Sequence, residues 1–358
     1  MTSARDVLPV TIVTGFLGSG KSTILNQVLH GEIGRDTAVL VNEFGEVGLD
    51  HLLIEAVETN AVLLDNGCVC CSIRGELREA LVDLLARRAN GDIPPFSRVV
   101  LETTGLAMPA PIIATILTDP ALRSHYALRN VVTVVDSAQA RRHGVEHAEW
   151  RAQIAVADRL VVTKSDLVDG ATLAKVRTML ERANPTATIH MRGISDSASA
   201  LAEVLFGEGH ASDMLHMALL QRLGRLQPVL GLSEIGESGG RLAHRGPSAP
   251  GEAPGVEAFC MTIDEPIEWE VFTLWFTMLL HRHGDALLRF KGILNIMGSA
   301  RPAVVHAVQN LVHPVSHLDR AISPGTPSQL VFIGIGLESD AIEASYHRFC
   351  SRLQPAGA

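Results

Sequence analysis

Short apolar runs alternate with stretches of helical spacing over the first half of the chain. Residues 10–14 are β-branched and end at Gly15, which is typical of a buried strand that enters a turn. Residues 22–30 then have helical spacing. Further strands are predicted at 38–41, 61–64, 98–101, 131–135 and 159–163, and helices at 75–89, 109–117 and 171–182. This alternation predicts an α/β fold, a parallel sheet with helices on both faces.

The pattern changes near residue 207. Residues 231–256 are rich in Gly, Pro and Ser, which favours a flexible linker. Beyond the linker, strands are predicted at 256–263, 289–296, 302–312 and 329–335, and helices at 267–281 and 338–349. The sequence therefore predicts a first domain at 1–206, a linker at 207–256 and a smaller C-terminal α+β domain at 257–358.

Composition and charge exclude several classes of protein. The hydrophobic content of 47% is sufficient for a core, and no apolar run approaches the ~20 residues of a membrane span. The N-terminal residues lack the pattern of a signal peptide. A net charge of −9 argues against a general nucleic-acid binder. We expect a cytoplasmic protein with reduced thiols and with neither nucleic acid nor a membrane as its partner.

The stretch GFLGSGKST, residues 15–23, matches the phosphate-binding pattern G-x-x-x-x-G-K-[ST] between a predicted strand and a predicted helix. Glycines let the backbone wrap closely around phosphates, and amide N–H groups at a helix N-terminus favour an anion. Lys21 is expected to reach the β- and γ-phosphates and Ser22 to bind Mg²⁺. The expected nucleotide-binding residues of this loop are Gly15, Gly18, Ser19, Gly20, Lys21, Ser22 and Thr23.

Two further motifs follow predicted strands. In TKSDL, Asp166 can accept both the ring N–H and the exocyclic amine of guanine, which favours GTP over ATP. Thr163 stands before Lys164, where guanine-binding loops usually have asparagine, so one amide contact is expected to be missing. In ETTGL, Glu102 is expected to hold Mg²⁺ through a water and Gly105 to offer its N–H to the γ-phosphate. Lys21 and Glu102 are the candidate catalytic residues, and turnover is expected to be slow because no side chain is an obvious base.

Three of the five cysteines, Cys68, Cys70 and Cys71, lie within four positions of a long chain with few cysteines, which argues against a disulfide framework. They precede a predicted helix, and the helix N-terminus with Arg74 and Arg78 is expected to lower their pKa. Thiolates bind soft or borderline cations. Neighbouring side chains project in different directions, so Glu46 is a candidate additional ligand. A structural zinc site and a redox pair are the alternatives.

Five motifs, in their order and spacing, resemble those of the CobW-type metallochaperone GTPases, a branch of the P-loop GTPases. They are GFLGSGKST, NEFGEVG, NGCVCCSIRGEL, ETTGLA and TKSDL. The resemblance extends over nearly the whole chain apart from the linker, and includes the C-terminal segments LRFKGILNI and QLVFIGI. It implies GTP hydrolysis coupled to handling of a transition metal, commonly zinc, with cobalt or iron in some members. Many members carry a His-rich stretch near the linker, whereas this chain has only His210, His216 and His244 there.

The sequence leaves several functions open. The first is a GTP-dependent switch in which NEFGEVG and Gly105 respond to the nucleotide and the thiols deliver a metal to a client metalloprotein. The second is a regulatory GTPase with a structural zinc site. The others are a nucleotide-dependent enzyme with an activated cysteine and a metal buffer without useful GTPase activity. The metal, the client and the oligomeric state, with a homodimer among the options, are not determined by the sequence.

Overall fold

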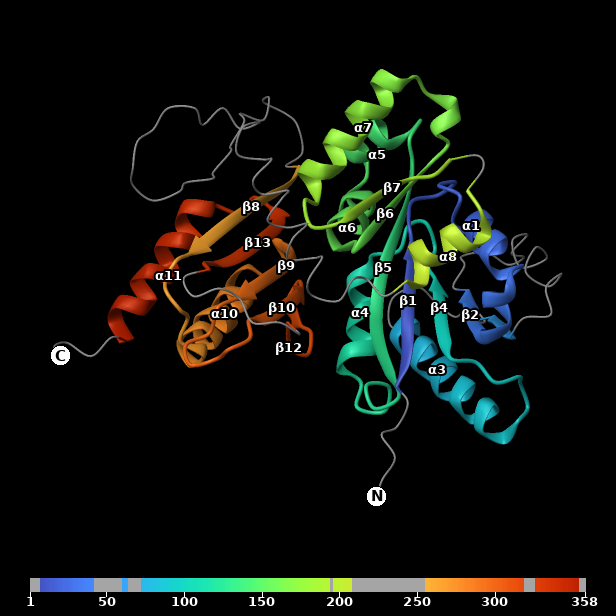
Figure 1. Cartoon of the computed structure of the whole chain (residues 1–358), viewed down its shortest axis with the longest axis horizontal. Helices are drawn as coiled ribbons and strands as arrows, with labels where there is room; N and C mark the ends of the chain where they lie inside the picture. Colours follow the sequence, from blue (N-terminus) through green and yellow to red (C-terminus); the bar gives the residue numbers. More distant parts are fainter. Residues whose placement is uncertain are drawn as a thin grey trace. The chain divides into compact units, whose positions relative to one another are not determined.

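The computed structural model describes residues 7–41, 60–63, 72–193, 196–207, 255–318 and 326–353 (Figure 1). The chain divides into two compact units, Met1–Thr178 with Ala187–Gly209, and Met179–Thr186 with His210–Ala358. Most of the predicted linker lies outside the described residues, so the domain limits at 206 and 257 stay a prediction. The two units are considered separately below.

The first unit is built on a parallel sheet of seven described strands in the order β3-β2-β4-β1-β5-β6-β7. The central strands are mostly buried, as their near-continuous runs of Val, Ile and Leu predict. Their bounds are β1 Leu8–Thr14, β2 Thr37–Val41, β3 Asn60–Leu63, β4 Arg98–Glu102, β5 Tyr126–Asp136, β6 Arg159–Thr163 and β7 Thr188–Met191.

Helices cover both faces of this sheet (Figure 1). On one face, Leu25 and Val28 of α1 and Leu201 of α8 pack against valines of β1, β2, β4, β5 and β6. On the other face, α4 contacts β5, and α3 and α6 pack beside it. The helices of this unit are α1 Lys21–Leu29, η1 Glu32–Asp36, α3 Ser72–Asn90, α4 Pro109–Thr118, α5 Ala140–Glu146, α6 Ala148–Val156, η2 Ser165–Leu167, α7 Gly170–Ala183 and α8 Ala198–Phe206; the end of α7, from Met179, is assigned to the second unit.

The predicted α/β fold is confirmed, with differences of physical origin. Six strands and four helices of the first unit lie where the apolar pattern predicted them, within a few residues except at the start of β5. The pattern did not predict β7, an edge strand whose side chains are only partly buried, or α5, α6 and α8. In α6 the buried positions run continuously from Ala152 to Val156, so the helix has no clear polar face. Amphipathic periodicity is therefore absent from α6, although the helix is present.

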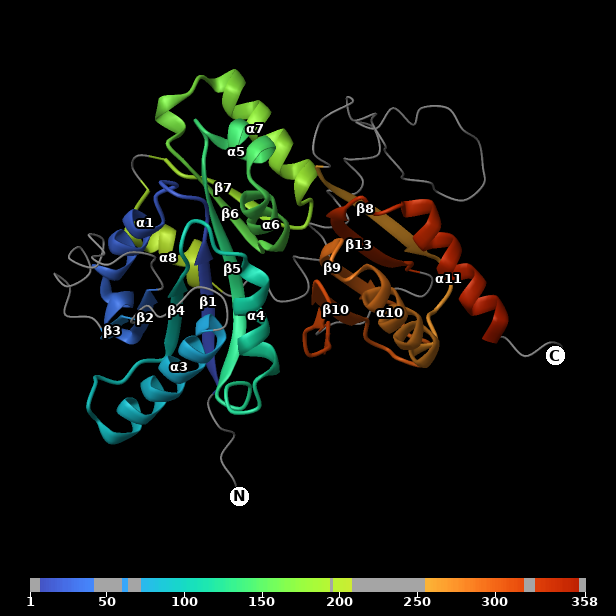
Figure 2. The ribbon, with the colours of Figure 1, turned by 180° about the vertical axis from the view of Figure 1, so that it is seen from behind.

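The second unit consists of an antiparallel sheet with two helices on one face (Figure 2). Phe290 of β9 and Phe332 of β13 face Phe276 of α10 and Tyr346 of α11 in one aromatic core. The strand predicted at 302–312 is instead a hairpin, because the chain turns at Gln309, whose φ is +52°. The elements are β8 Val256–Ile263, α10 Trp269–His283, β9 Leu287–Leu294, β10 Ala303–Val308, β11 Leu311–Val312, β12 Ser316–His317, β13 Ser328–Ile335 and α11 Ser339–Leu353.

None of the helices in the described part of the chain has both the length and the apolar composition that crossing a bilayer requires.

Candidate functional site

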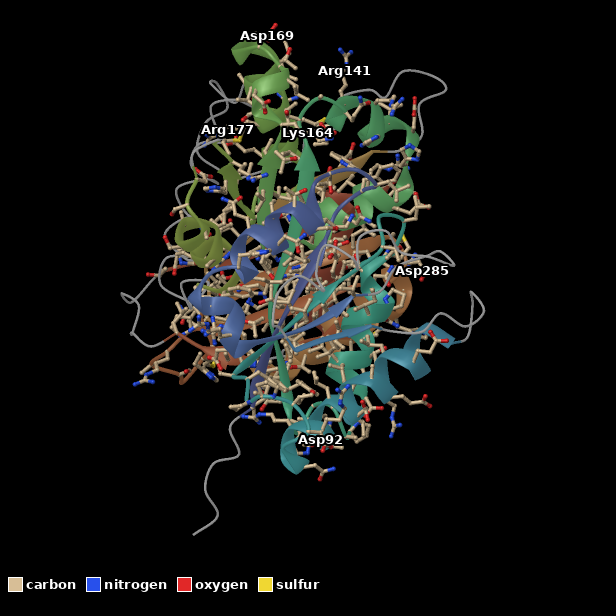
Figure 3. All side chains as sticks on the ribbon, turned by 90° about the vertical axis from the view of Figure 1, so that its right-hand side faces the viewer. Asp92, Arg141, Lys164, Asp169, Arg177 and Asp285 are labelled. Atoms are coloured by element: carbon tan, nitrogen blue, oxygen red, sulfur yellow. The ribbon has the colours of Figure 1, made fainter. Side chains whose placement is uncertain are left out.

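The carboxyl ends of four adjacent strands, β4, β1, β5 and β6, bring the sequence motifs to one edge of the first unit's sheet. Glu102 ends β4, Asp136 ends β5 and Thr163 ends β6, while the glycine-rich loop follows β1. Figure 3 shows Lys164 and Arg141 at this end of the unit and Asp92 at the opposite end. Ligands of open α/β sheets bind at such an edge, where strands of one direction all end.

The glycine-rich loop has the backbone that the motif requires. Gly15 has a φ of +142°, and a Cβ added to it would lie 2.3 Å from the carbonyl oxygen of Val134 in β5. Gly20, with a φ of +95°, immediately precedes α1. Only glycine adopts these conformations without strain, so the loop can wrap tightly at the N-terminus of α1.

Polar groups of this loop lie buried at the site. The Lys21 Nζ donates to the carbonyl oxygens of Gly15 and Phe16, at 2.9 and 3.3 Å, and so lies across the loop. The side chain of Ser19 is 1% exposed, and its Oγ has no hydrogen-bond partner among the described residues; the same is true of Thr104 Oγ1. Buried hydroxyl groups normally have partners, so these atoms fit a site built for a ligand rich in oxygen.

Ser22 and Glu102 meet across 80 positions of sequence: the Ser22 Oγ donates to Glu102 Oε1 at 2.8 Å. Glu102 is 3% exposed, and a carboxylate beside a hydroxyl is the oxygen donor set that Mg²⁺ prefers. The residues that the sequence named for Mg²⁺ are therefore brought together. A neighbouring bond, from Thr103 Oγ1 to Thr14 Oγ1 at 2.8 Å, joins the ends of β4 and β1.

The loop after β4 packs directly on the glycine-rich loop. A Cβ added to Gly105 would lie 2.5 Å from the backbone nitrogen of Leu17, so only glycine permits this approach. Gly105 and Ala107 also accept hydrogen bonds from the side chain of Gln153, which is 0% exposed. Sequence reasoning missed Gln153, since a lone glutamine within an apolar helix gives no recognisable signal.

The region expected to bind the base is more open. Asp166 is exposed in the short helix η2, where its carboxylate is accessible to a ligand. Lys164 has a φ of +55°, and its Nζ lies 2.8 Å from Asp136 Oδ2. The Thr163 Oγ1 donates to the carbonyl oxygen of Ser19 at 2.7 Å. Thr163, predicted only as a weaker substitute for asparagine, thus joins the end of β6 to the glycine-rich loop.

Two histidines that the sequence analysis did not single out lie against the same loop. The rings of His143 and His147 lie 4.5 and 4.3 Å from the ring of Phe16. Burial, followed by the charges of Arg142 and His147, holds the pKa of His143 below its usual value. A largely neutral His143 can therefore pack against Phe16 without a buried charge.

The predicted thiol site falls on residues outside those that the structure describes, namely Cys68, Cys70, Cys71 and Glu46. The described residues contain no group of three or more His, Cys, Asp or Glu side chains placed to hold a metal. Arg78, expected to lower the pKa of the thiols, has its Nε 2.9 Å from Asp119 Oδ2. Its effect on the thiols stays a prediction.

Comparison with known proteins identifies the family. A family model described as the CobW/HypB/UreG nucleotide-binding domain matches residues 9–191, which is more than half of the chain. The chain belongs to the CobW/HypB/UreG family. The cobalamin synthesis protein CobW C-terminal domain matches residues 256–349 as well, so the resemblance that the motifs indicated is confirmed.

Members of the CobW/HypB/UreG family with curated names include the zinc chaperone YjiA of Escherichia coli, which is 32% identical over 95% of this chain and 98% of its own. The zinc chaperone CobW of Pseudomonas aeruginosa is 35% identical over 50% of this chain and 55% of its own. The crystal structure of the Zn(II)-bound YjiA GTPase from E. coli matches with a TM-score of 0.68 and 26% identity over 96% of this chain and 99% of its own. This chain is therefore a P-loop GTPase with a CobW C-terminal domain.

Proposed function

We propose that this GTPase is a zinc chaperone that binds Zn²⁺ at Cys68, Cys70 and Cys71 and transfers it to a client metalloprotein. The hydrogen bond between Ser22 and Glu102 carries the nucleotide part of the proposal, because it unites the two expected Mg²⁺ residues beside the glycine-rich loop. The names of the relatives, zinc chaperones in E. coli and P. aeruginosa, support zinc as the cargo. Cobalt or iron is the alternative cargo.

In the proposed reaction the chain's own groups bind and orient GTP. The glycine-rich loop and the N-terminus of α1 surround the phosphates, and Lys21 exchanges its bonds to Gly15 and Phe16 for phosphate oxygens. Ser22 and Glu102 would hold Mg²⁺, which neutralises charge on the phosphates when bound. Asp166 selects guanine, and Gly105 senses the γ-phosphate. No described side chain at the site is placed as an evident base, so slow turnover is expected.

The metal part of the proposal depends on coupling between the two sites. Residues 42–59 follow β2, which pairs with β4, and residues 64–71 follow β3, which pairs with β2. The carboxyl ends of β2 and β3 lie at the same edge of the sheet as the glycine-rich loop, which supports a common response of both segments to the nucleotide. A coupling of a few kcal/mol suffices, because each 1.4 kcal/mol changes an affinity tenfold.

The test is the dissociation constant of Zn²⁺ measured with a non-hydrolysable GTP analogue and with GDP. We expect the two constants to differ by about tenfold or more, since that is the size of a typical coupling. Replacing Cys68, Cys70 and Cys71 by serine should abolish the binding, whereas Cys260→Ser, at a partly buried cysteine of the second unit, is the control. Equal constants in the two nucleotide states would contradict the coupling.

A regulatory GTPase with a structural zinc site is the second candidate. It predicts that Zn²⁺ stays bound through the nucleotide cycle and that a chelator unfolds the protein. A chaperone instead keeps its fold on chelation and loses metal transfer. Thermal unfolding with and without chelator distinguishes the two. Capture with a GTP-analogue-loaded chain, followed by metal analysis of the captured protein, then identifies a client.

A further inference from the structure

The α5–α6 hairpin contacts both loops that surround the phosphates. At the end of α5, the rings of His143 and His147 pack on Phe16 of the glycine-rich loop. Within α6, the Gln153 Nε2 donates to the carbonyl oxygens of Gly105 and Ala107, at 3.1 and 3.0 Å. One short structural element therefore contacts the loop that binds the phosphates and the loop that follows Glu102.

This hairpin is firmly held in place. The Arg151 Nη1 donates to the carbonyl oxygens of Gly144 and Val145, at 3.1 and 3.0 Å, and so joins α6 to α5. The Thr133 Oγ1 of β5 donates to the backbone oxygen of Gln153 at 2.7 Å. Because β5 also lies against Gly15, the same strand supports the hairpin and the glycine-rich loop. The side chain of Gln153 thus projects from a rigid support.

The contacts of Gln153 are specific to the loop after β4. The Oε1 of this fully buried side chain has no hydrogen-bond partner among the described residues, so its polar bonds there are the two that it donates to the loop. Burying an amide with one unpaired atom is unfavourable, and an apolar side chain would avoid that cost. Leu106 and Met108, which flank Ala107, have exposed side chains. Gln153 therefore holds this segment by hydrogen bonds to the backbone of the segment.

We propose that Gln153 is a positioning residue that fixes Gly105 for contact with the γ-phosphate and thereby sets the preference for GTP over GDP. Gly105 already lies against Leu17, with no room for a side chain between them. The loop after β4 therefore contacts both the glycine-rich loop and the Gln153 amide. A loop fixed in this way can present its N–H groups to a phosphate without first becoming ordered.

This inference rests on the γ-phosphate-sensing role proposed above for Gly105, and the experiment separates the two. The dissociation constants of a non-hydrolysable GTP analogue and of GDP are measured for the wild-type chain and for Gln153→Met, Gln153→Glu, Gly105→Ala and Tyr126→Phe. The ratio of the GDP constant to the analogue constant measures the preference for GTP. Methionine retains the length of the side chain without donors. Glutamate retains its shape but donates at most one hydrogen bond. Tyr126→Phe removes a buried hydrogen bond to the carbonyl oxygen of Leu81, away from Gln153 and Gly105, and so controls for a general loss of stability.

We expect Gln153→Met to weaken binding of the GTP analogue by roughly tenfold, as for the loss of two hydrogen bonds, and to change GDP binding less than about twofold. The KM for GTP should rise with it. Tyr126→Phe should lower the melting temperature and leave the ratio of the two constants unchanged. If Gln153→Met does not fold, the same ratio measured for Gln153→Glu decides the question.

Two results would overturn the inference. The first is that Gly105→Ala lowers the preference for the GTP analogue over GDP while the Gln153 variants leave it unchanged. Gly105 would then sense the phosphate without Gln153. The second is an equal loss of GTP-analogue and GDP binding, which indicates a general structural role. An unchanged ratio in Gly105→Ala as well would instead contradict the role proposed for Gly105.

Discussion

The two sides of the nucleotide site differ in how they are built. On the phosphate side, Ser19, Lys21 and Glu102 are all less than 10% exposed, and the bonds there join loops that are far apart in sequence. On the base side, Asp166 is exposed in a single turn after β6. Electrostatic interactions are stronger where water is excluded. The phosphate side is therefore suited to catalysis and nucleotide sensing, and the base side to selection of the nucleotide.

The comparison predicts its largest effect for Glu102→Gln. Glutamine retains an oxygen for Ser22 but removes the buried negative charge that would attract Mg²⁺. We expect kcat for GTP to fall by about a hundredfold, as when one electrostatic group is removed from an active site. The Mg²⁺ concentration for half-maximal rate should rise. Unchanged Mg²⁺ dependence, measured by phosphate release, would contradict the role of Glu102.

A smaller effect is expected for Asp166→Asn. An asparagine accepts one hydrogen bond where the carboxylate accepts two, so the preference for guanine should weaken. Inosine triphosphate lacks the exocyclic amine, and the wild-type chain should prefer GTP to it by about tenfold or more. In the variant this preference should largely disappear while kcat changes little. Competition between the two nucleotides measures it, and a retained preference would place recognition of the base elsewhere.

Thr163→Val tests the junction between the two sides. The substitution removes the hydroxyl that donates its one proton to the carbonyl oxygen of Ser19 at 2.7 Å, with the carbonyl oxygen of Val135 at 3.2 Å. The free energy of unfolding should fall by about 1–2 kcal/mol, because a buried carbonyl loses its donor. GTP and GDP affinities should fall together, since the loop carries both. Chemical denaturation and nucleotide titration check this, and loss of GTP binding alone would contradict it.

The smallest effect concerns pH. Because burial and then Arg142 and His147 hold the pKa of His143 below its usual value, the unfolded chain takes up this proton first. Stability is therefore lost as the pH falls from the usual histidine pKa of about 6.5 towards the lower folded-state value. His143→Phe keeps a ring on Phe16 and should reduce the loss of stability between pH 7.5 and 5.5 by less than about 1 kcal/mol. Thermal unfolding measures it, with exposed His30→Phe as the control.

The sequence predicted the parts of the site that have local signatures. A glycine-rich turn, a lysine at the start of a helix and a glutamate at a strand end can be recognised from the sequence alone. Gly15, Lys21 and Glu102 lie where those patterns predicted. His143 and Gln153 have no such signal, because their contacts with Phe16 and Gly105 span 127 and 48 positions. The strand β7 was not predicted, because a partly exposed edge strand has no continuous apolar run.

By itself the sequence determined the α/β class, the family and the residues that meet the phosphates, since these depend on local backbone conformation and on the burial of apolar runs. Only the tertiary structure decided which loops support one another. The order β4-β1-β5-β6 places Glu102 beside Ser22 and Thr163 beside Ser19. Packing of the α5–α6 hairpin places the Gln153 side chain within hydrogen-bond distance of Gly105. Such contacts depend on how strands are ordered in space, which the periodicity of any single segment does not encode.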